Sequence, residues 1–185
     1  IDAGGNPLES THHHASFYTT TDVAACATSM SLYLGAAGAW HRDLFRKYGK
    51  IQFPECYDDL VLGFRAALEQ RITYIAEPLL YYRHGVGISY RPHLKNETRA
   101  MKAIARRDGL QIVAATLSQR LMDAKTFGMN PTDPIYQKIV NRLAYAQTRS
   151  AFYTDFGAFM RSALSYPVAA LRTFFSESYR VVVNK

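Results

Sequence analysis

Two adjacent aspartates, Asp58 and Asp59, stand immediately before an apolar stretch with helical periodicity. Free main-chain amides and the helix dipole stabilise an ionised carboxylate at the start of a helix. An ionised Asp there can accept the proton of an attacking alcohol, an effect of ~10²–10⁴ in rate. Asp is also a favoured N-cap, worth ~1 kcal/mol of helix stability. The pair therefore predicts a general base, a helix cap, or one residue in each role.

A second group that could do chemistry is the pair Arg83 and His84, which opens a glycine-bearing loop. Arg pairs with phosphate oxygens, and His can ligate a divalent metal or hydrogen-bond a phosphate. An Arg-His pair in a loop is also compatible with an ordinary solvated surface. The order of carboxylates, helix, strand and basic loop favours a site that activates a hydroxyl beside a phosphate.

The elements that must position these groups have mixed helix and strand character. We expect a helix over residues 41–48, ended by Gly49 in a left-handed conformation, and a second over residues 60–69, capped by Asp58 or Asp59. The patterns predict strands at residues 31–34, 72–75 and 79–82. Small residues from Gly35 to Gly38 allow close approach to the backbone, either by a ligand or by a neighbouring element.

Helical periodicity dominates after Pro92, where we expect a separate domain. The patterns predict helices over residues 97–106, 110–125, 135–153 and 168–182. Asp133 suits an N-cap, and Pro134 suits the first position of the third of these helices. The predicted division is an α/β domain over residues 1–91 and a basic α-helical extension over residues 92–185.

Four segments, in this order, resemble the catalytic domain of family 2 glycosyltransferases, which has the GT-A fold. The family patterns are D-x-x-G-x-P-L, G-x-x-x-A-x-R-R-x-L-F-x-x-F-G, E-D-x-x-L-x-x-R and E-P-L-V-x-Y-R-x-H. The matching segments are Ile1–Leu8, Gly35–Gly49, Asp58–Ala66 and Glu77–His84. The resemblance covers about residues 1 to 90 and implies the C-terminal half of a GT-A domain followed by the helical extension.

The resemblance also implies roles for particular residues of an inverting sugar transferase. It makes Asp59 the general base, with Asp58 in place of the usual Glu, and His84 a contact of a metal–diphosphate group. Arg65 matches the motif's arginine, as a structural or phosphate-facing residue. The other expected substrate-binding residues are Gly35, Gly38, Trp40 and Arg83.

The family's Asp-x-Asp metal motif does not occur anywhere in the chain. The resemblance therefore implies that a divalent cation, Mg²⁺ or Mn²⁺, and most of the nucleotide-sugar donor are bound outside this chain. We expect the chain to be a piece of a longer enzyme and inactive alone. The implied acceptor is a saccharide or lipid-linked saccharide in bacterial surface polysaccharide or lipopolysaccharide assembly.

Charge is distributed unevenly along the chain. The net charge is −2 over residues 1–90 and +9 over residues 91–185, which suits an anionic partner or a solvated basic face. The segment Leu164–Val182 predicts a basic, aromatic helix that lies on an anionic membrane surface or contacts its own domain or a partner. No nucleic-acid motif accompanies the charge, so we expect no nucleic-acid partner.

Two features of the sequence, the length of its apolar runs and the spacing of its cysteines, bear on where the protein is located. No apolar run reaches about 18 residues, and two cysteines without metal spacing indicate a reducing compartment. We expect a cytoplasmic protein at the inner face of the membrane. The alternative to an enzyme is a non-catalytic helical module whose basic face binds a membrane or a protein partner.

Overall fold

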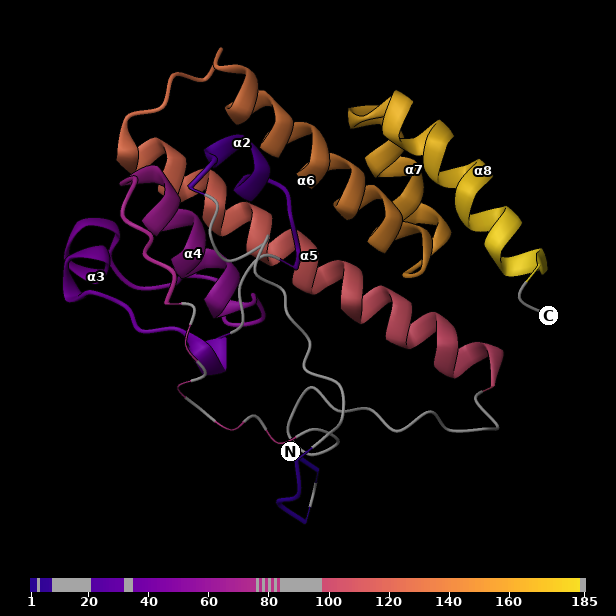
Figure 1. Cartoon of the computed structure of the whole chain (residues 1–185). Coiled ribbons are helices and arrows are strands. Elements are labelled where there is room, and N and C mark those ends of the chain that lie inside the picture. The colour runs from indigo at the N-terminus through magenta and orange to yellow at the C-terminus, as the bar shows by residue number, and fades with distance from the viewer. Residues whose placement is uncertain are drawn as a thin grey trace.

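The computed structural model describes residues 1–2, 4–7, 21–31, 35–75, 77, 79, 81, 83 and 98–183, and within these residues the chain is all-helical (Figure 1). A short 3₁₀ turn, η1 (Gly35–Ala37), precedes the longer helices. The seven α-helices of the described residues are α2 (Val23–Cys26), α3 (Arg42–Tyr48), α4 (Asp58–Leu68), α5 (Arg99–Phe127), α6 (Pro134–Phe152), α7 (Phe156–Ser165) and α8 (Pro167–Val183).

The expected α/β fold, a partial GT-A domain, is wrong for the part of the chain that the structure describes, because no strand forms in it. Residues 72–75 follow α4 without a ladder partner among the described residues, and Ile75 there is 58% exposed. A strand forms only where a neighbour pairs with its backbone, so β-branched composition alone does not produce one. The predicted strands at 31–34 and 79–82 fall partly outside the described residues.

The first predicted helix is confirmed, with one difference at its start. Helix α3 begins at Arg42, after His41 as N-cap, and ends at Gly49, whose φ is +72°. Its Leu44 and Tyr48 are buried in the core, whereas Phe45 is 45% exposed. A glycine with positive φ follows the helix as expected, but its ψ of −164° lies outside the left-handed helical region that the sequence predicted.

Helix α5 is the longest element, with 29 residues, and it passes through Gly109, where the sequence predicted a break between two helices. A glycine inside a helix is less favourable than alanine by ~1 kcal/mol, but it keeps its amide donor and does not end the helix. Thr98 caps the start of α5, and Gly128, with φ +93°, ends it. Asp133 and Pro134 begin α6 as expected.

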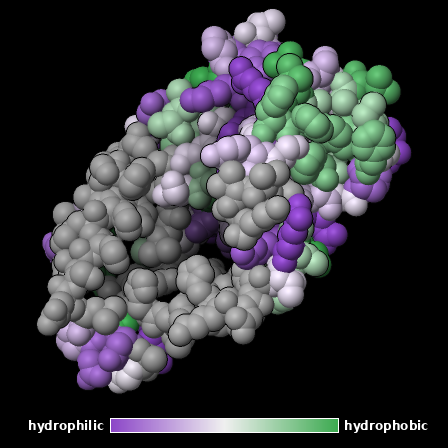
Figure 2. All heavy atoms as spheres, turned by 90° about the vertical axis from the view of Figure 1, so that its right-hand side faces the viewer, coloured by the Kyte–Doolittle hydropathy of each residue, from purple (hydrophilic) through white to green (hydrophobic). Residues whose placement is uncertain are grey.

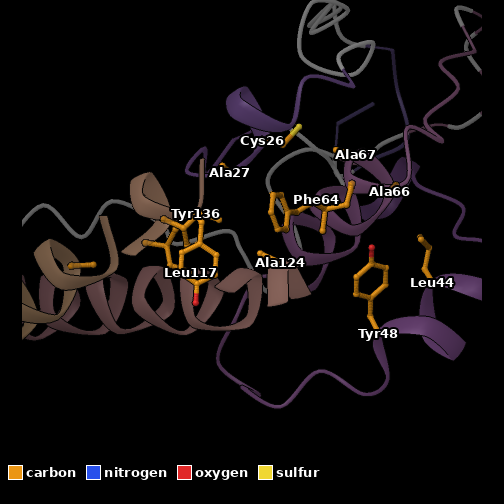
Figure 3. Close-up of a cluster of buried hydrophobic side chains, with 13 residues drawn as sticks. Cys26, Ala27, Leu44, Tyr48, Phe64, Ala66, Ala67, Leu117, Ala124 and Tyr136 are labelled. Atoms are coloured by element: carbon orange, nitrogen blue, oxygen red, sulfur yellow. The ribbon is translucent and has the colours of Figure 1, made fainter. Parts of the chain in front are cut away.

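One core joins helices α2 to α6 (Figure 3). Phe64 of α4 and Leu117 of α5 are fully buried in it, with Tyr48 of α3 at its edge. Cys26 of α2 is also fully buried, as expected for a structural thiol. Because α4 and α5 share this core, residues on both sides of position 91 contact each other; the predicted domain boundary itself stays a prediction.

Helices α7 and α8 form a second layer on α6 and contact each other (Figure 1). Asp155 caps α7, its carboxylate accepting from the amide of Ala158 at 2.7 Å. The sequence did not predict α7 as a separate helix. Among the helices of the described residues, none combines the length and the apolar character needed to cross a bilayer.

Candidate functional site

Asp59 lies in the first turn of α4, half-buried, with both carboxylate oxygens oriented by main-chain amides. Its Oδ2 accepts from the amide of Gly35 at 3.0 Å, and its Oδ1 accepts from the amide of Leu60 at 2.7 Å. The residue that precedes the helix, Tyr57, is the N-cap and makes no side-chain cap bond. The expected cap at Asp58 or Asp59 is therefore wrong by one or two positions, and both aspartates lie inside the helix.

Asp58 faces solvent beside Asp59. Its side chain is exposed, and its Oδ1 accepts from the amide of Asp59 at 2.9 Å. The two aspartates thus have different surroundings, although they are adjacent in sequence. Only Asp59 is fixed to a second segment of the chain, so the structure distinguishes it from Asp58 as the positioned carboxylate.

The glycines of the predicted acceptor segment make room for side chains of this chain itself. A Cβ built at Gly35 would lie 3.1 Å from the Cβ of Asp59, and one built at Gly38 would lie 2.9 Å from the Trp40 ring. Contacts this short are rare between real side chains. Of the two sequence interpretations of the small residues, close approach by a neighbouring element is the one seen here, and it brings Gly35, Gly38, Trp40 and Asp59 into one neighbourhood.

Arg65 lies six residues after Asp59 on α4, and its partners are Asp123 and Gly49. Its side chain is 0% exposed and forms a two-point ion pair with Asp123 of α5, with Nε–Oδ2 at 2.8 Å and Nη2–Oδ1 at 3.0 Å. Its Nη1 donates to the carbonyl of Gly49 at 3.0 Å. The guanidinium is satisfied within the protein, which supports the structural role among the two that the sequence left open.

A buried polar stripe on α5 holds the loop and helix that carry Asp59, and sequence reasoning did not identify it. Thr116 accepts from the amide of Tyr57 at 3.1 Å, and Gln119 accepts from the amide of Gln52 at 2.7 Å. Arg120, fully buried, donates to the carbonyls of residues 27, 29 and 60. The sequence signal was available as four polar residues at i, i+3, i+4 and i+7: Thr116, Gln119, Arg120 and Asp123.

The remaining predicted site residues are Arg83 and His84. Arg83 is exposed and forms no hydrogen bond or ion pair with other described residues. His84, the predicted metal contact, lies outside the described residues. Within the described part of the chain, no group of His, Cys, Asp or Glu side chains has the arrangement to hold a metal ion. The described residues therefore do not fit the expected divalent cation.

A small charged cluster stands at the end of α4. The Glu69 carboxylate accepts from Lys47 at 2.6 Å and from the hydroxyl of Tyr48. Burial alone would raise the pKa of Glu69, but the hydrogen bonds from Lys47 and Tyr48, together with the positive charges of Lys47 and Arg71, lower it below its ordinary value of 4.5. Burial and the same contact raise the pKa of Tyr48. The cluster fastens α3 to the end of α4.

A second charged cluster surrounds Glu177 of α8, whose side chain is fully buried. Its carboxylate accepts from Arg149 Nε at 2.5 Å and from the hydroxyl of Tyr153 at 2.6 Å, and Arg106 Nη2 lies 3.4 Å away. Burial, and then the hydrogen bond to Glu177, raise the pKa of Tyr153 from 10.0 to about 12. This cluster joins α5, α6 and α8, and it fixes which side of α8 faces the protein.

No family model matches the chain, and neither a curated protein nor a solved structure is significantly similar to it.

Proposed function

We propose that this protein transfers a sugar from a nucleotide-sugar donor to a saccharide or lipid-linked saccharide acceptor, with inversion, and that Asp59 is the general base. The observation that carries the proposal is the placement of Asp59. It is half-buried at a helix start, and both of its oxygens are oriented by main-chain amides. The four segments that resemble family 2 glycosyltransferases support the same reaction class.

The hydrogen bonds at Asp59 leave the carboxylate able to react. Each oxygen accepts one amide, from Gly35 or Leu60, and each has a further lone pair that can accept from a sugar hydroxyl. In the proposed step the acceptor oxygen attacks the anomeric carbon while its proton passes to Asp59. The bond from that carbon to the nucleotide diphosphate breaks, and the diphosphate leaves with the electron pair.

Two aromatic residues in the segments that carry Gly35 and Asp59 suit a sugar acceptor. Trp40 is half-buried and Tyr57, two residues before Asp59, is 46% exposed, so both leave part of their aromatic surface open to solvent. Sugar rings present C–H faces that lie well against aromatic rings, and their hydroxyls need polar partners at the edge. The proposal further includes a divalent cation, Mg²⁺ or Mn²⁺, bound mainly by residues other than those described.

The experiment measures sugar transfer by the protein that carries this sequence. A panel of nucleotide sugars is offered with Mg²⁺ or Mn²⁺ and simple saccharide acceptors, and released nucleotide and product are quantified. We expect Asp59→Asn to lower kcat at least ~10²-fold, with little change in the KM of the donor, because it removes proton acceptance and keeps the side-chain shape.

Asp133→Asn is the matched control. Asp133 also stands at a helix start and accepts from a main-chain amide at 2.7 Å, but it lies at the turn before α6. The control variant should keep wild-type turnover, and circular dichroism should show both variants folded. Wild-type turnover in Asp59→Asn, or a protein that neither binds nor uses any nucleotide sugar, would refute the proposal.

A second function is favoured by a separate observation, the exposed apolar surface of the C-terminal helices. Phe156 and Leu164 of α7 are 77% and 83% exposed, which is unusual for large apolar side chains. Such a surface fits the alternative from the sequence, a helical module that binds a membrane or another protein. The two functions are compatible, because Asp59 and these helices lie in different layers of the fold.

A further inference from the structure

Helix α8 packs on the protein with its polar side. The residues that it buries are Ala170, Thr173 and Glu177, spaced by three and four positions along one face. Glu177 reaches the arginines of α5 and α6, as described above. Thr173 is fully buried, and its hydroxyl has no hydrogen-bond partner among the described residues. An amphipathic helix at the edge of a protein normally buries its apolar face, so this orientation is reversed.

The opposite face of α8 is apolar and faces away from the protein. We define the outer stripe as Val168, Leu171, Phe175 and Tyr179, which follow one another by three or four positions and are 67%, 61%, 66% and 70% exposed. Figure 2 views the side of the molecule on which α8 lies and shows hydrophobic residues gathered in one continuous area with hydrophilic residues at its edges. The four side chains of the outer stripe therefore form one apolar face along α8.

Helix α7 extends this surface. Its exposed apolar side chains, Phe156, Met160 and Leu164, are spaced by four residues and therefore share one face. Both helices rest on α6 and touch each other, so their outer faces are both turned away from α6. A large exposed apolar area on a folded protein marks a site for a partner or a membrane.

Cations border the outer stripe of α8, and an exposed acid, Asp155, stands at the start of α7. A hollow next to the outer stripe is lined by Tyr145, Leu171, Phe175 and Arg172, and it continues into a second hollow lined by Arg142 and others. Arg142 and Arg172 are exposed and form no ion pair with other described residues. Between residues 156 and 183, the sequence has one acid, Glu177, and it is buried.

We propose that α7 and α8 dock this protein on a bilayer surface rich in anionic lipids. Apolar side chains of the outer stripe would enter the boundary between headgroups and acyl chains, while Arg142 and Arg172 contact lipid phosphates. The charge selects this occupant. A second copy would bring the same cations face to face, whereas an anionic bilayer supplies both the apolar layer and the opposite charge.

The test is sedimentation of the protein with vesicles, either of phosphatidylcholine alone or of an equal mixture with phosphatidylglycerol. We expect binding to the mixed vesicles and much weaker binding to phosphatidylcholine, and a loss of affinity with added salt. Leu171→Ser with Phe175→Ser should weaken binding at least about tenfold. Arg142→Gln with Arg172→Gln should weaken it about twenty-five-fold, since each arginine near the surface contributes about fivefold.

Matched controls use exposed residues of α3 and the exposed Lys50 just after it, on the other side of the molecule. Phe45 is 45% exposed, and Phe45→Ser should leave vesicle binding unchanged, as should Arg42→Gln with Lys50→Gln. Circular dichroism of every variant distinguishes lost docking from lost folding. The changed positions on α8 face solvent, so these variants should remain folded.

Equal binding to both vesicle types, or undiminished binding by the Leu171→Ser, Phe175→Ser variant, would overturn the proposal. So would a dimer in analytical ultracentrifugation that this variant abolishes, because the occupant would then be a second copy. The assay contains no sugar and no nucleotide. Its failure would leave the role of Asp59 standing, and failure of the Asp59→Asn test would leave the docking surface standing.

Discussion

The buried pair Arg65–Asp123 makes a strong prediction about stability. Both side chains are almost fully buried, at 0% and 1% exposure, and two N–H···O bonds of 2.8 and 3.0 Å join them. Asp123→Asn leaves the Arg65 charge buried without its counter-charge. Removing one partner of a buried pair typically costs ~3–5 kcal/mol. Against a typical total stability of ~5–15 kcal/mol, we expect this variant to lose a large part of its stability.

Replacing both partners should be much less harmful. In Arg65→Met with Asp123→Leu no unpaired charge remains, and the losses are the hydrogen bonds to Gly49 and from Gln119, at ~1 kcal/mol each. We expect the double variant to lose ~1–3 kcal/mol. The free energies of unfolding of the two single variants and the double variant, measured in urea, form a cycle that isolates the pair.

An exposed Arg–Asp pair provides the comparison, in which both arginine nitrogens donate to one oxygen, Oδ1. Arg107 and Asp108 are joined by bonds of 3.1 and 3.0 Å, but their side chains are 37% and 43% exposed. Asp108→Asn should therefore change the unfolding free energy by less than ~1 kcal/mol. If Asp123→Asn were equally mild, or if the double variant lost as much as the two singles summed, the reasoning from burial would be refuted.

Three further predictions concern single groups. Gly35→Val should displace Asp59, because a Cβ added at position 35 would lie only 3.1 Å from the Cβ of Asp59. We expect the rate of sugar transfer to fall at least ~10-fold, while the melting temperature changes little. Unchanged transfer would show that the contact between Gly35 and Asp59 is not needed. Glu69 has a lowered pKa, so its contribution to stability is present above pH 4.5 and is lost as the pH falls through the folded-state pKa; urea unfolding of Glu69→Gln should differ from wild type near neutrality and match it in acid. Tyr153, whose pKa is raised from 10.0 to about 12, stabilises the fold below pH 10 and loses this contribution between pH 10 and 12. Tyr153→Phe should remove a step near pH 12 from the phenolate absorbance titration, and a titration identical to wild type would contradict the assignment.

Much of the local helical structure could be predicted from the sequence, because its determinants are local. Gly49 ends α3 in a positive-φ conformation, and Asp133 with Pro134 begins α6, as their residue types predict. The predicted break in the long helix was wrong, because a single glycine at position 109 is less unfavourable than the loss of a continuous helix. Caps and turns depend on a few neighbouring atoms, which a sequence displays directly.

The strands could not be predicted in the same way, because pairing is not local. Residues 72–75 have β-branched and aromatic side chains, yet they lie without a strand partner among the described residues. A short apolar run states only that a segment is able to pair. Whether it pairs depends on where a second segment lies, and no property of residues 72–75 contains that information.

The candidate site shows the same division. The aspartate pair was found from sequence, but which of the two is fixed depends on Gly35, 24 residues away. Arg65 carried two interpretations, and the residue that decides between them is Asp123, in a different helix. The sequence identified the chemistry-bearing residues, and contacts across the fold distinguish the positioned ones from the rest.

Helix α8 shows what amphipathic periodicity alone leaves open. The spacing of its residues separates one polar face from one apolar face, but the spacing is identical whichever face is buried. The partners of Glu177 decide the question: Arg149 and Tyr153 hold the polar face inward. Burying that carboxylate is favourable only because cations and a hydroxyl meet it, and the apolar face is thereby left outside. The apolar surface of α8 is therefore exposed because the polar contacts of Glu177 hold the opposite face inward. Without these contacts, nothing would favour exposure of the apolar face.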